Sequence, residues 1–299
     1  MSPQSLGDMI DKNSVSPYNE MVAYEYLYSL DKSSLKKMTD MTVHSGLLPT
    51  EALAEQFGLF APEGIDAIED YLSEKLGSFS VAVNNTPAWP DKLKHSERPT
   101  PLFYYEGNIS LMELPSISIV GSRKASEDGL KRAARLAHEL AEVGFVIVSG
   151  LARGIDTIAM TSAMRNNGRV IGVIGTPIDE YYPKENKPLQ QLVGEKHLLV
   201  SQVPFYKYAN QPFKTRRYYF PERNELMAAI SDATVIVEAS DTSGTLTQAR
   251  ACMHQGRPLF ILQSCYDNPN IEWPRKWAKR ENVHVVSSTE QILEKLKDY

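Results

Sequence analysis

Residues 116–126 read SISIVGSRKAS and combine the residue types that bind phosphate. An apolar, β-branched run ends at Gly121, and Ser122, Arg123 and Lys124 follow before a helical pattern begins. Glycine lets the backbone approach an anion closely, and an arginine guanidinium can hold a phosphate through two parallel hydrogen bonds. The stretch matches neither the G-x-G-x-x-G fingerprint nor the lysine-containing P-loop. It therefore predicts phosphate binding without saying which phosphate is bound.

Three further turns of the same character follow later apolar runs, at residues 149–156, 175–177 and 240–247. Such turns are rich in Gly, Ser and Thr, which are also routine turn formers, so a single one is weak evidence. Because the carboxyl ends of parallel strands share one edge of a sheet, four of them together predict a phosphate site at that edge. The candidate ligand residues in the later turns are Ser149, Gly150, Gly154, Ser243, Gly244 and Thr245.

Several of these residues also have an ordinary structural interpretation. Ser126 and Ser243 are placed to cap the helices that follow them. Arg123 could be a surface cation beside a neighbouring carboxylate, and Asp156 could simply complement the dipole of the helix that it begins.

Residues 206–224, YKYANQPFKTRRYYFPERN, form a second candidate site, which we call the basic-aromatic segment. Cations that neutralise the backbone, interleaved with aromatic rings on which bases stack, are typical of single-stranded nucleic acid binding. The alternative is a solvated loop whose aromatic rings fill the core, which we favour for Phe220. The segment's candidate DNA-binding residues are Lys214, Arg216, Arg217, Arg223 and Asn224.

Residues that could carry out catalysis are sparse. The six histidines show no metal-ligand spacing, and Cys252 and Cys265 form no CxxC pair. Ser149 is not in a G-x-S-x-G elbow, and no pair of carboxylates stands out for acid–base work. We therefore expect a protein that is not an enzyme and that uses no cofactor or metal.

The elements that position these turns are short apolar strands alternating with amphipathic helices from residue 116 onward. Strands are predicted at 117–120, 145–149, 170–175, 198–203, 234–239, 258–262 and 283–287. Helices are predicted near 127–143, 154–166, 222–230, 244–255 and 290–297. Strands that are apolar on both faces and separated by helices indicate a parallel sheet covered on both sides. The predicted fold is α/β, an extended Rossmann-like, doubly wound, mostly parallel sheet.

The first part of the chain has a different pattern. Apolar residues recur at helical spacing there, so residues 1–83 are predicted to be a small all-helical region. Residues 84–299 are predicted to form the Rossmann-like domain, with its core at about 116–265. Between them, residues 84–108 are rich in proline and turn residues and read as a connection whose apolar-aromatic end docks on the next domain.

Composition limits the class of protein. The chain has 299 residues, 42% of them hydrophobic, and a formal net charge of -5, so any nucleic-acid site must be a local patch. Two cysteines exclude a disulfide framework and suit a reducing cytoplasm. Residues 1–13 lack the basic and apolar regions of a signal peptide, and no apolar run is long enough to span a membrane.

Residues from about 87 to 264 resemble the DNA-processing protein A (DprA/Smf) family. The matching stretches, in chain order, are WPDKL, PTPLFYYEG, IVGSRKAS, VSGLARGID, VIGVIGTPIDEYYPKEN, FPERNELMAAIS, VIVEA, SGTLTQA and GRPLFIL. The resemblance implies a non-catalytic homodimer that binds single-stranded DNA, protects it and helps to load a RecA-type recombinase in DNA uptake, natural transformation and recombination. It also implies that Gly121, Ser122 and Arg123 hold DNA phosphate. With its last residue at Tyr299, the chain is expected to be a divergent member lacking a C-terminal winged helix.

A nucleotide-binding protein is the alternative. Phosphoribohydrolases of the lysine-decarboxylase-like type share the Rossmann-like fold and carry a G-G-x-G-T-x-x-E motif, whereas this chain has Gln248 where that acid would stand. An amide cannot act as a general base, so hydrolysis loses its main group. Nucleotide sensing, for instance in defence against phage, stays open.

Overall fold

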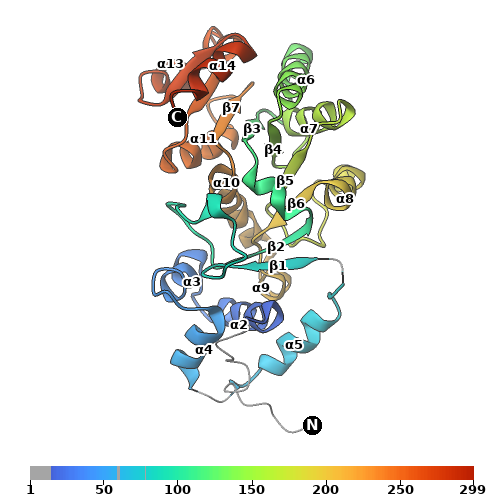
Figure 1. The fold of residues 1–299 in the computed structure, drawn as a ribbon, viewed down its shortest axis with the longest axis vertical. Helices are drawn as coiled ribbons and strands as arrows, with labels where there is room; N and C mark the ends of the chain where they lie inside the picture. The colour runs from blue at the N-terminus through green and yellow to red at the C-terminus, as the bar shows by residue number, and fades with distance from the viewer. Residues whose placement is uncertain (1–14, 59–60, 78) are drawn as a thin grey trace.

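The computed structural model describes residues 15–58, 61–77 and 79–299, and these residues form one nine-stranded sheet with helices on both faces (Figure 1). The strand order is β1-β2-β6-β5-β4-β3-β7-β8-β9. Pairing is parallel from β6 through to β9, whereas β2 pairs antiparallel with both β6 and β1. The predicted α/β class and mostly parallel sheet are therefore confirmed. The signal-peptide prediction concerns residues 1–13, which lie outside the described residues.

The strands are short and mostly buried along their whole length, as their apolar residues on both faces predict. Their bounds are β1 Ser80–Val83, β2 Leu102–Gly107, β3 Ser116–Val120, β4 Val146–Ser149, β5 Val170–Ile174, β6 Leu198–Ser201, β7 Ala233–Ile236, β8 Leu259–Leu262 and β9 Val283–Val286.

The helices divide between the two faces of the sheet. On one face lie α6 Glu127–Glu142, α7 Ile155–Arg165, α8 Lys187–Lys196 and α14 Thr289–Leu296. On the other lie α10 Tyr219–Ile230, α11 Thr245–His254, α12 Gln263–Tyr266 and α13 Trp273–Trp277. The short 3-10 helices are η1 Asp91–Leu93, η2 Ile109–Glu113, η3 Lys184–Asn186 and η4 Phe213–Tyr218. This double cover buries both faces of the sheet.

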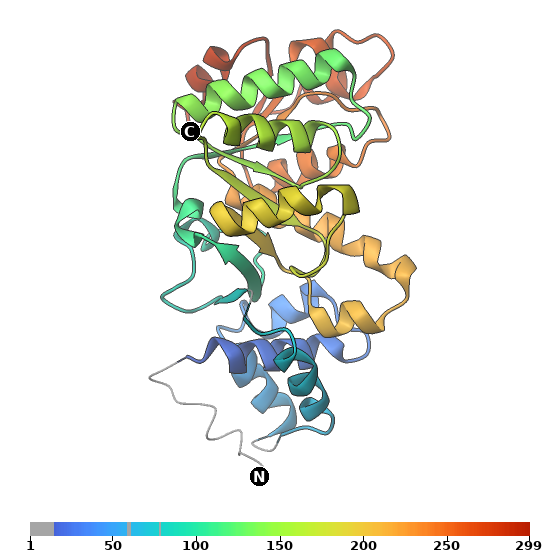
Figure 2. The same cartoon turned by 90° about the vertical axis from the view of Figure 1, so that its right-hand side faces the viewer.

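A group of helices packs beside the β1 end of the sheet (Figures 1 and 2). It consists of α2 Pro17–Ser29, α3 Leu35–Met41, α4 Pro49–Phe57 and α5 Ile65–Ser73, with α9 Phe205–Asn210 packed against α2. Glu25 of α2 is fully buried and accepts hydrogen bonds from the Tyr104 hydroxyl and from the backbone N–H groups of Phe205 and Tyr206. This carboxylate ties the helices to β2 and α9.

The prediction that residues 1–83 are all helical is wrong at its end. Residues 80–83 form β1, which pairs antiparallel with β2, and β2 contains the apolar-aromatic residues 102–105 that were read as the end of a connection. These four-residue and six-residue strands lie among Pro and turn residues, which hid their pattern.

Helix α10 begins three residues before its predicted start at Glu222. Pro221 suggested a later start, yet it occupies the third position of the helix. There its missing N–H would have had no intrahelical partner, so the proline does not interrupt the helix.

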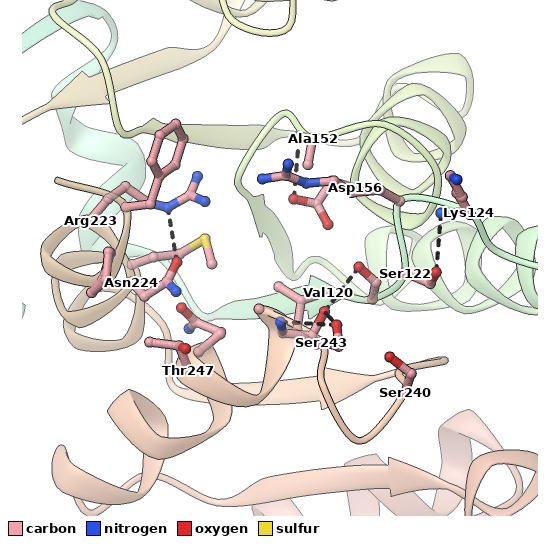
Figure 3. A pocket seen from close by; sticks show the side chains of 18 residues that line it. Val120, Ser122, Lys124, Ala152, Asp156, Arg223, Asn224, Ser240, Ser243 and Thr247 are labelled. Atoms are coloured by element: carbon pink, nitrogen blue, oxygen red, sulfur yellow. Dashed lines mark hydrogen bonds between the residues drawn. The ribbon is translucent and has the colours of Figure 1, made fainter. Parts of the chain in front are cut away.

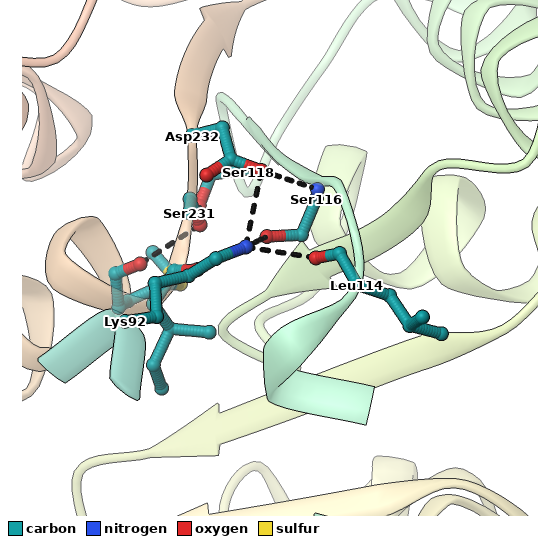
Figure 4. A network of polar contacts seen from close by, with 8 residues as sticks. Lys92, Leu114, Ser116, Ser118, Ser231 and Asp232 are labelled. Carbon is teal, nitrogen blue, oxygen red and sulfur yellow. Dashed lines mark hydrogen bonds and ion pairs between the residues drawn. The ribbon is translucent and has the colours of Figure 1, made fainter. Parts of the chain in front are cut away.

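Lys92 clamps the amino ends of β3 and β7 (Figure 4). Its Nζ donates to Leu114 O at 2.8 Å, to Ser116 Oγ at 3.2 Å and to Asp232 Oδ2 at 3.0 Å. Asp232 Oδ2 also accepts from the backbone N–H of Ser116 at 2.8 Å. The WPDKL stretch therefore has a structural task at the edge of the sheet opposite the carboxyl ends.

Candidate phosphate-binding cavity

A cavity of about 670 Å³ opens at the carboxyl ends of β3 and β7, and we call it the main cavity (Figure 3). β3 and β7 are neighbours in the sheet, yet β3 leads into α6 on one face and β7 leads into α11 on the other. Ligands of doubly wound sheets bind at such a switch point, where connections leave in opposite directions. The fold therefore places the turn after Val120 where a ligand is expected.

The turn after β3 forms one wall of the main cavity. Gly121, Ser122, Arg123 and Lys124 all line it. The Ser122 N–H donates to Glu238 O at 2.7 Å, and Ser122 Oγ accepts from the Lys124 N–H at 3.1 Å. These bonds hold the turn in shape. The Arg123 and Lys124 side chains stay exposed, so their charges face solvent and any ligand.

Gly154 lets the turn after β4 press against the turn after β3. Its φ is +76°, and a Cβ at this position would lie 2.3 Å from Ser122 O. Both observations require glycine, because other residues disfavour this φ and the space is already occupied by backbone. Gly154 therefore supports the main cavity from behind without lining it.

The start of α11 forms a second wall, next to the turn after β3. Gly244 is the N-cap residue, and Ser243 Oγ accepts from the Thr245 N–H at 3.2 Å. Thr245 Oγ1 donates to Gly121 O at 3.0 Å, which fastens this wall to the β3 turn. Ser243, Gly244 and Thr245 all line the main cavity, and the amino end of a helix favours anions. Ser126, by contrast, caps α6 by accepting from the Gly129 N–H.

Arg223 and Asp156 form a buried pair of charges at the back of the main cavity. Arg223 Nη1 donates to Gly150 O at 3.0 Å and to Val173 O at 2.6 Å, and its Nε donates to Asn224 Oδ1. Asp156 accepts from the N–H groups of Gly150 and Ala152. Burial raises the pKa of Asp156, an effect that Arg223 opposes, and burial lowers the pKa of Arg223 to about 10. The pair braces the β4 turn.

Two predicted ligand residues are turned away from the main cavity. Ser149 is fully buried, and its Oγ donates to Ile119 O at 2.8 Å. A Cβ on Gly150 would lie 2.3 Å from Arg223 Nη1, so this glycine makes room for the guanidinium. Both residues shape the site from behind.

The predicted cations at 214, 216 and 217 lie on η4, outside the main cavity. In Figure 2 the orange connection between α9 and α10, which contains η4, projects from the body of the molecule. The Arg216 guanidinium lies 4.4 Å from the centre of the Tyr208 ring, and Arg217 lies 5.3 Å from that of Tyr218. Phe213 is 82% exposed. Residues 213–218 therefore present cations beside aromatic rings on a surface outside the main cavity. Phe220, two residues after η4, lines the main cavity and so lies between the two surfaces along the chain.

Some lining residues were missed or assigned elsewhere. Phe220 is half-buried and lines the main cavity, although core packing was favoured for it. Met227 and Gln248 also line it, and Gln248 Oε1 is buried without a hydrogen-bond partner in the described part of the chain. Met227 lies one helical turn after Arg223 and Asn224, and that spacing was the signal available for it.

No group of three or more His, Cys, Asp or Glu side chains among the described residues is arranged to hold a metal ion. No helix in the same ranges is long and apolar enough to cross a membrane.

The fold and the main cavity define a Rossmann-like protein whose ligand edge presents cations, hydroxyl groups and a helix amino end. Residues 80–297 match the family model described as DNA recombination-mediator protein A. The chain belongs to this family.

Relatives and solved structures agree with the assignment. Over 189 residues the chain is 39% identical to DNA processing protein DprA of Streptococcus pneumoniae, covering 63% of this chain and 64% of that one. It is 28% identical to DprA of Bacillus subtilis, covering 88% and 86%. Against Protein Smf of Synechocystis the match spans about half of that relative.

Two solved structures share the fold. The X-ray structure of DprA from Streptococcus pneumoniae superposes with a TM-score of 0.66 at 28% identity, covering 96% of this chain and 95% of that chain. A structure of Helicobacter pylori DprA, described in terms of its single-stranded DNA binding mode, gives a TM-score of 0.62 at 27% identity. It covers 74% of this chain and 97% of that one.

Proposed function

We propose that this chain binds single-stranded DNA at the main cavity and acts as a recombination mediator. One observation carries the proposal. The exposed Arg123 and Lys124 and the amino end of α11 line one cavity, and a hydrogen bond from Thr245 to Gly121 O joins the two turns. Cations and helix N–H groups around one cavity can bind a phosphate of the DNA backbone, and such contacts do not depend on the base sequence.

The family supports the same ligand. Its description is that of a recombination mediator, and a relative of similar fold is described as binding single-stranded DNA. The basic-aromatic segment adds a surface on which bases could stack, because Arg216, Arg217 and the exposed Phe213 lie together on η4. We propose that the strand passes from the main cavity toward this segment by way of Phe220.

We further propose that binding is not followed by catalysis. Asp156 is the one acidic side chain among the described residues that line the main cavity, and it is already engaged by two backbone N–H groups. A general base must be free to reach a proton of the substrate. Gln248 stands where a nucleotide hydrolase of similar fold would need a carboxylate.

The partners proposed for the chain are a RecA-type recombinase and a second copy of itself, in the cytoplasm. The description of the family as a recombination mediator supports a recombinase as partner. Cys252 and Cys265 are buried free thiols, as expected in a reducing compartment. Light scattering would test the dimer, and pull-down with a recombinase on single-stranded DNA would test the recombinase contact.

Fluorescence anisotropy with labelled oligonucleotides of unrelated sequence tests the binding. Arg123→Ala is expected to weaken all sequences alike and to lower the slope of log affinity against log salt by roughly 0.7, the value for one lost phosphate contact on a single strand. Arg165→Ala is the matched control, since Arg165 is exposed at the far end of α7. No binding at low salt by folded protein would refute the proposal. Release of free base from nucleoside monophosphates would favour the nucleotide-processing alternative.

A further inference from the structure

Two smaller cavities continue the main cavity along the carboxyl edge of the sheet. The first, which we call the middle cavity, has a volume of about 380 Å³ and shares Ser122, Lys124 and Ser240 with the main cavity. The second, which we call the outer cavity, has a volume of about 110 Å³ and shares Arg132 and Ser264 with the middle one. The three cavities therefore form a chain of hollows with common walls.

Their order follows the order of the strands. The middle cavity is lined by residues that follow β3, β7 and β8, and the outer cavity by residues that follow β8 and β9. These strands are neighbours in the sheet in that sequence. Three strand steps from β3 to β9 cover about 14 Å. That distance corresponds to about four nucleotides at a stacked rise of ~3.4 Å per residue.

Arg132 stands where the two smaller cavities meet. It belongs to α6, lines both cavities, and its Nε is buried without a hydrogen-bond partner among the described residues. Arg135 lines the outer cavity one turn further along α6. A buried guanidinium nitrogen without a partner is costly, and a phosphate oxygen would satisfy it.

The acidic groups beside these arginines already have partners. In the middle cavity, Glu238 accepts from the Ser126 N–H at 3.0 Å and from its hydroxyl at 2.6 Å. In the outer cavity, Glu139 accepts from the Thr289 hydroxyl and lies 3.7 Å from Arg135 Nε. Arg132 has no such ion pair within the described residues. It is therefore the cation available to an incoming anion.

We propose that the DNA strand held at the main cavity continues through the middle cavity to the outer one, with Arg132 binding a second backbone phosphate. This inference rests on the proposed function and adds the path and length of the bound strand. It assigns α6 and the ends of β8 and β9 to the DNA-binding surface.

The test compares an oligothymidylate of about 2 nucleotides, too short for the four-nucleotide path, with one of about 16 nucleotides, the upper end of common single-strand site sizes. Arg132→Ala is expected to weaken binding of the long oligonucleotide by about tenfold, which corresponds to about 1.4 kcal/mol, near the lower end of the value of a hydrogen bond to a charged group. It should also lower the salt slope by roughly 0.7. Binding of the short one should change by less than about twofold, because the main cavity alone holds it.

Lys131→Ala is the matched control. Lys131 is the neighbouring cation on α6, its side chain is 75% exposed, and it lines none of the three cavities. The control removes the same net charge, so it should leave both oligonucleotides within about twofold of the unmodified protein. Denaturant unfolding of both variants checks that Arg132→Ala is folded, and Arg132→Lys should restore part of the long-strand affinity.

The outcomes separate the two proposals. If Arg132→Ala binds both lengths like the unmodified protein, or weakens both equally, the extended path is wrong while the main cavity stands. If the unmodified protein binds neither length, the proposed function fails and the path fails with it. If Arg123→Ala loses both lengths and Arg132→Ala loses only the long one, both proposals hold.

Discussion

Arg123 and Arg223 both belong to the candidate site, yet the structure predicts opposite consequences for their removal. Arg223→Ala would leave Gly150 O and Val173 O without a donor and Asp156 without its compensating charge. A buried polar group left unsatisfied costs about 1–3 kcal/mol. Two carbonyls lose their donor, so we expect Arg223→Ala to lower the free energy of unfolding by about 2–6 kcal/mol.

Arg123 is exposed and carries no ion pair within the described residues, so Arg123→Ala should change the free energy of unfolding by less than about 0.5 kcal/mol. Urea denaturation followed by circular dichroism measures both variants. Anisotropy at a temperature where each variant is folded then gives the DNA affinity. We expect Arg123→Ala to lose affinity at full stability and Arg223→Ala to lose stability first.

A double variant makes the comparison sharper. Asp156→Asn combined with Arg223→Met removes both charges, and the two substitutions should be less than additive by about 0.5–3 kcal/mol, as for residues of one hydrogen-bond network that meet at Gly150. Full stability of Arg223→Ala together with loss of DNA binding would refute the reasoning, because Arg223 would then be a ligand residue. Strict additivity in the double variant would show that the two charges do not compensate one another.

Three further predictions concern stability. Lys92→Met should lower the free energy of unfolding by about 1–3 kcal/mol in thermal melts, because it leaves the Leu114 carbonyl without this donor and Asp232 with the Ser116 N–H alone. Exposed Lys94→Met should not. Burial raises the pKa of Glu25 and of Glu222 to about 7 from 4.5, so the folded protein holds extra protons in that window. The free energy of unfolding should therefore fall as the pH rises from about 5 to about 7, by up to about 1.4 kcal/mol per pH unit for each group, and should then level off. Glu25→Gln should flatten this profile, which urea titration at a series of pH values measures. Gly154→Ala should destabilise by about 1–3 kcal/mol in the same assay, because its φ of +76° and the nearby backbone oxygen exclude a Cβ; an unchanged midpoint would contradict this.

The sequence was sufficient where local pattern and fold coincide. The apolar runs 117–120 and 234–239 contain all of β3 and β7 except the first residue of each. The four Gly-rich and Ser-rich turns were predicted at one edge, and those after β3 and β7 line one cavity. The antiparallel extension by β1 and β2 was not predicted, because short strands among prolines carry too weak an alternation.

Other features depend on contacts that no local pattern contains. Arg223 was predicted to contact DNA because it lies in a basic run, but its partners Gly150 and Val173 are 73 and 50 residues away. Arg132 lies inside an amphipathic helix, where a cation usually marks a solvated face. Arg132 lines a cavity because residues after β8 and β9, which are distant in sequence, form the other walls. Such residues are visible once the strand order is known.

The charge of the whole molecule sets how this site must work. With a formal net charge of -5, the protein offers a polyanion little long-range attraction, and screening limits that range to about 8–10 Å. Attraction must therefore come from close contact of the DNA with Arg123, Lys124 and the start of α11. Behind them, the positive charge of Arg223 compensates the negative charge of Asp156. Loss of a close contact speeds dissociation more than it slows encounter. Arg123→Ala should consequently raise the dissociation rate of DNA by about tenfold and change the association rate by less than about threefold, as measured by stopped flow. A large change in the association rate with little change in the dissociation rate would mean that Arg123 steers the strand instead of holding it.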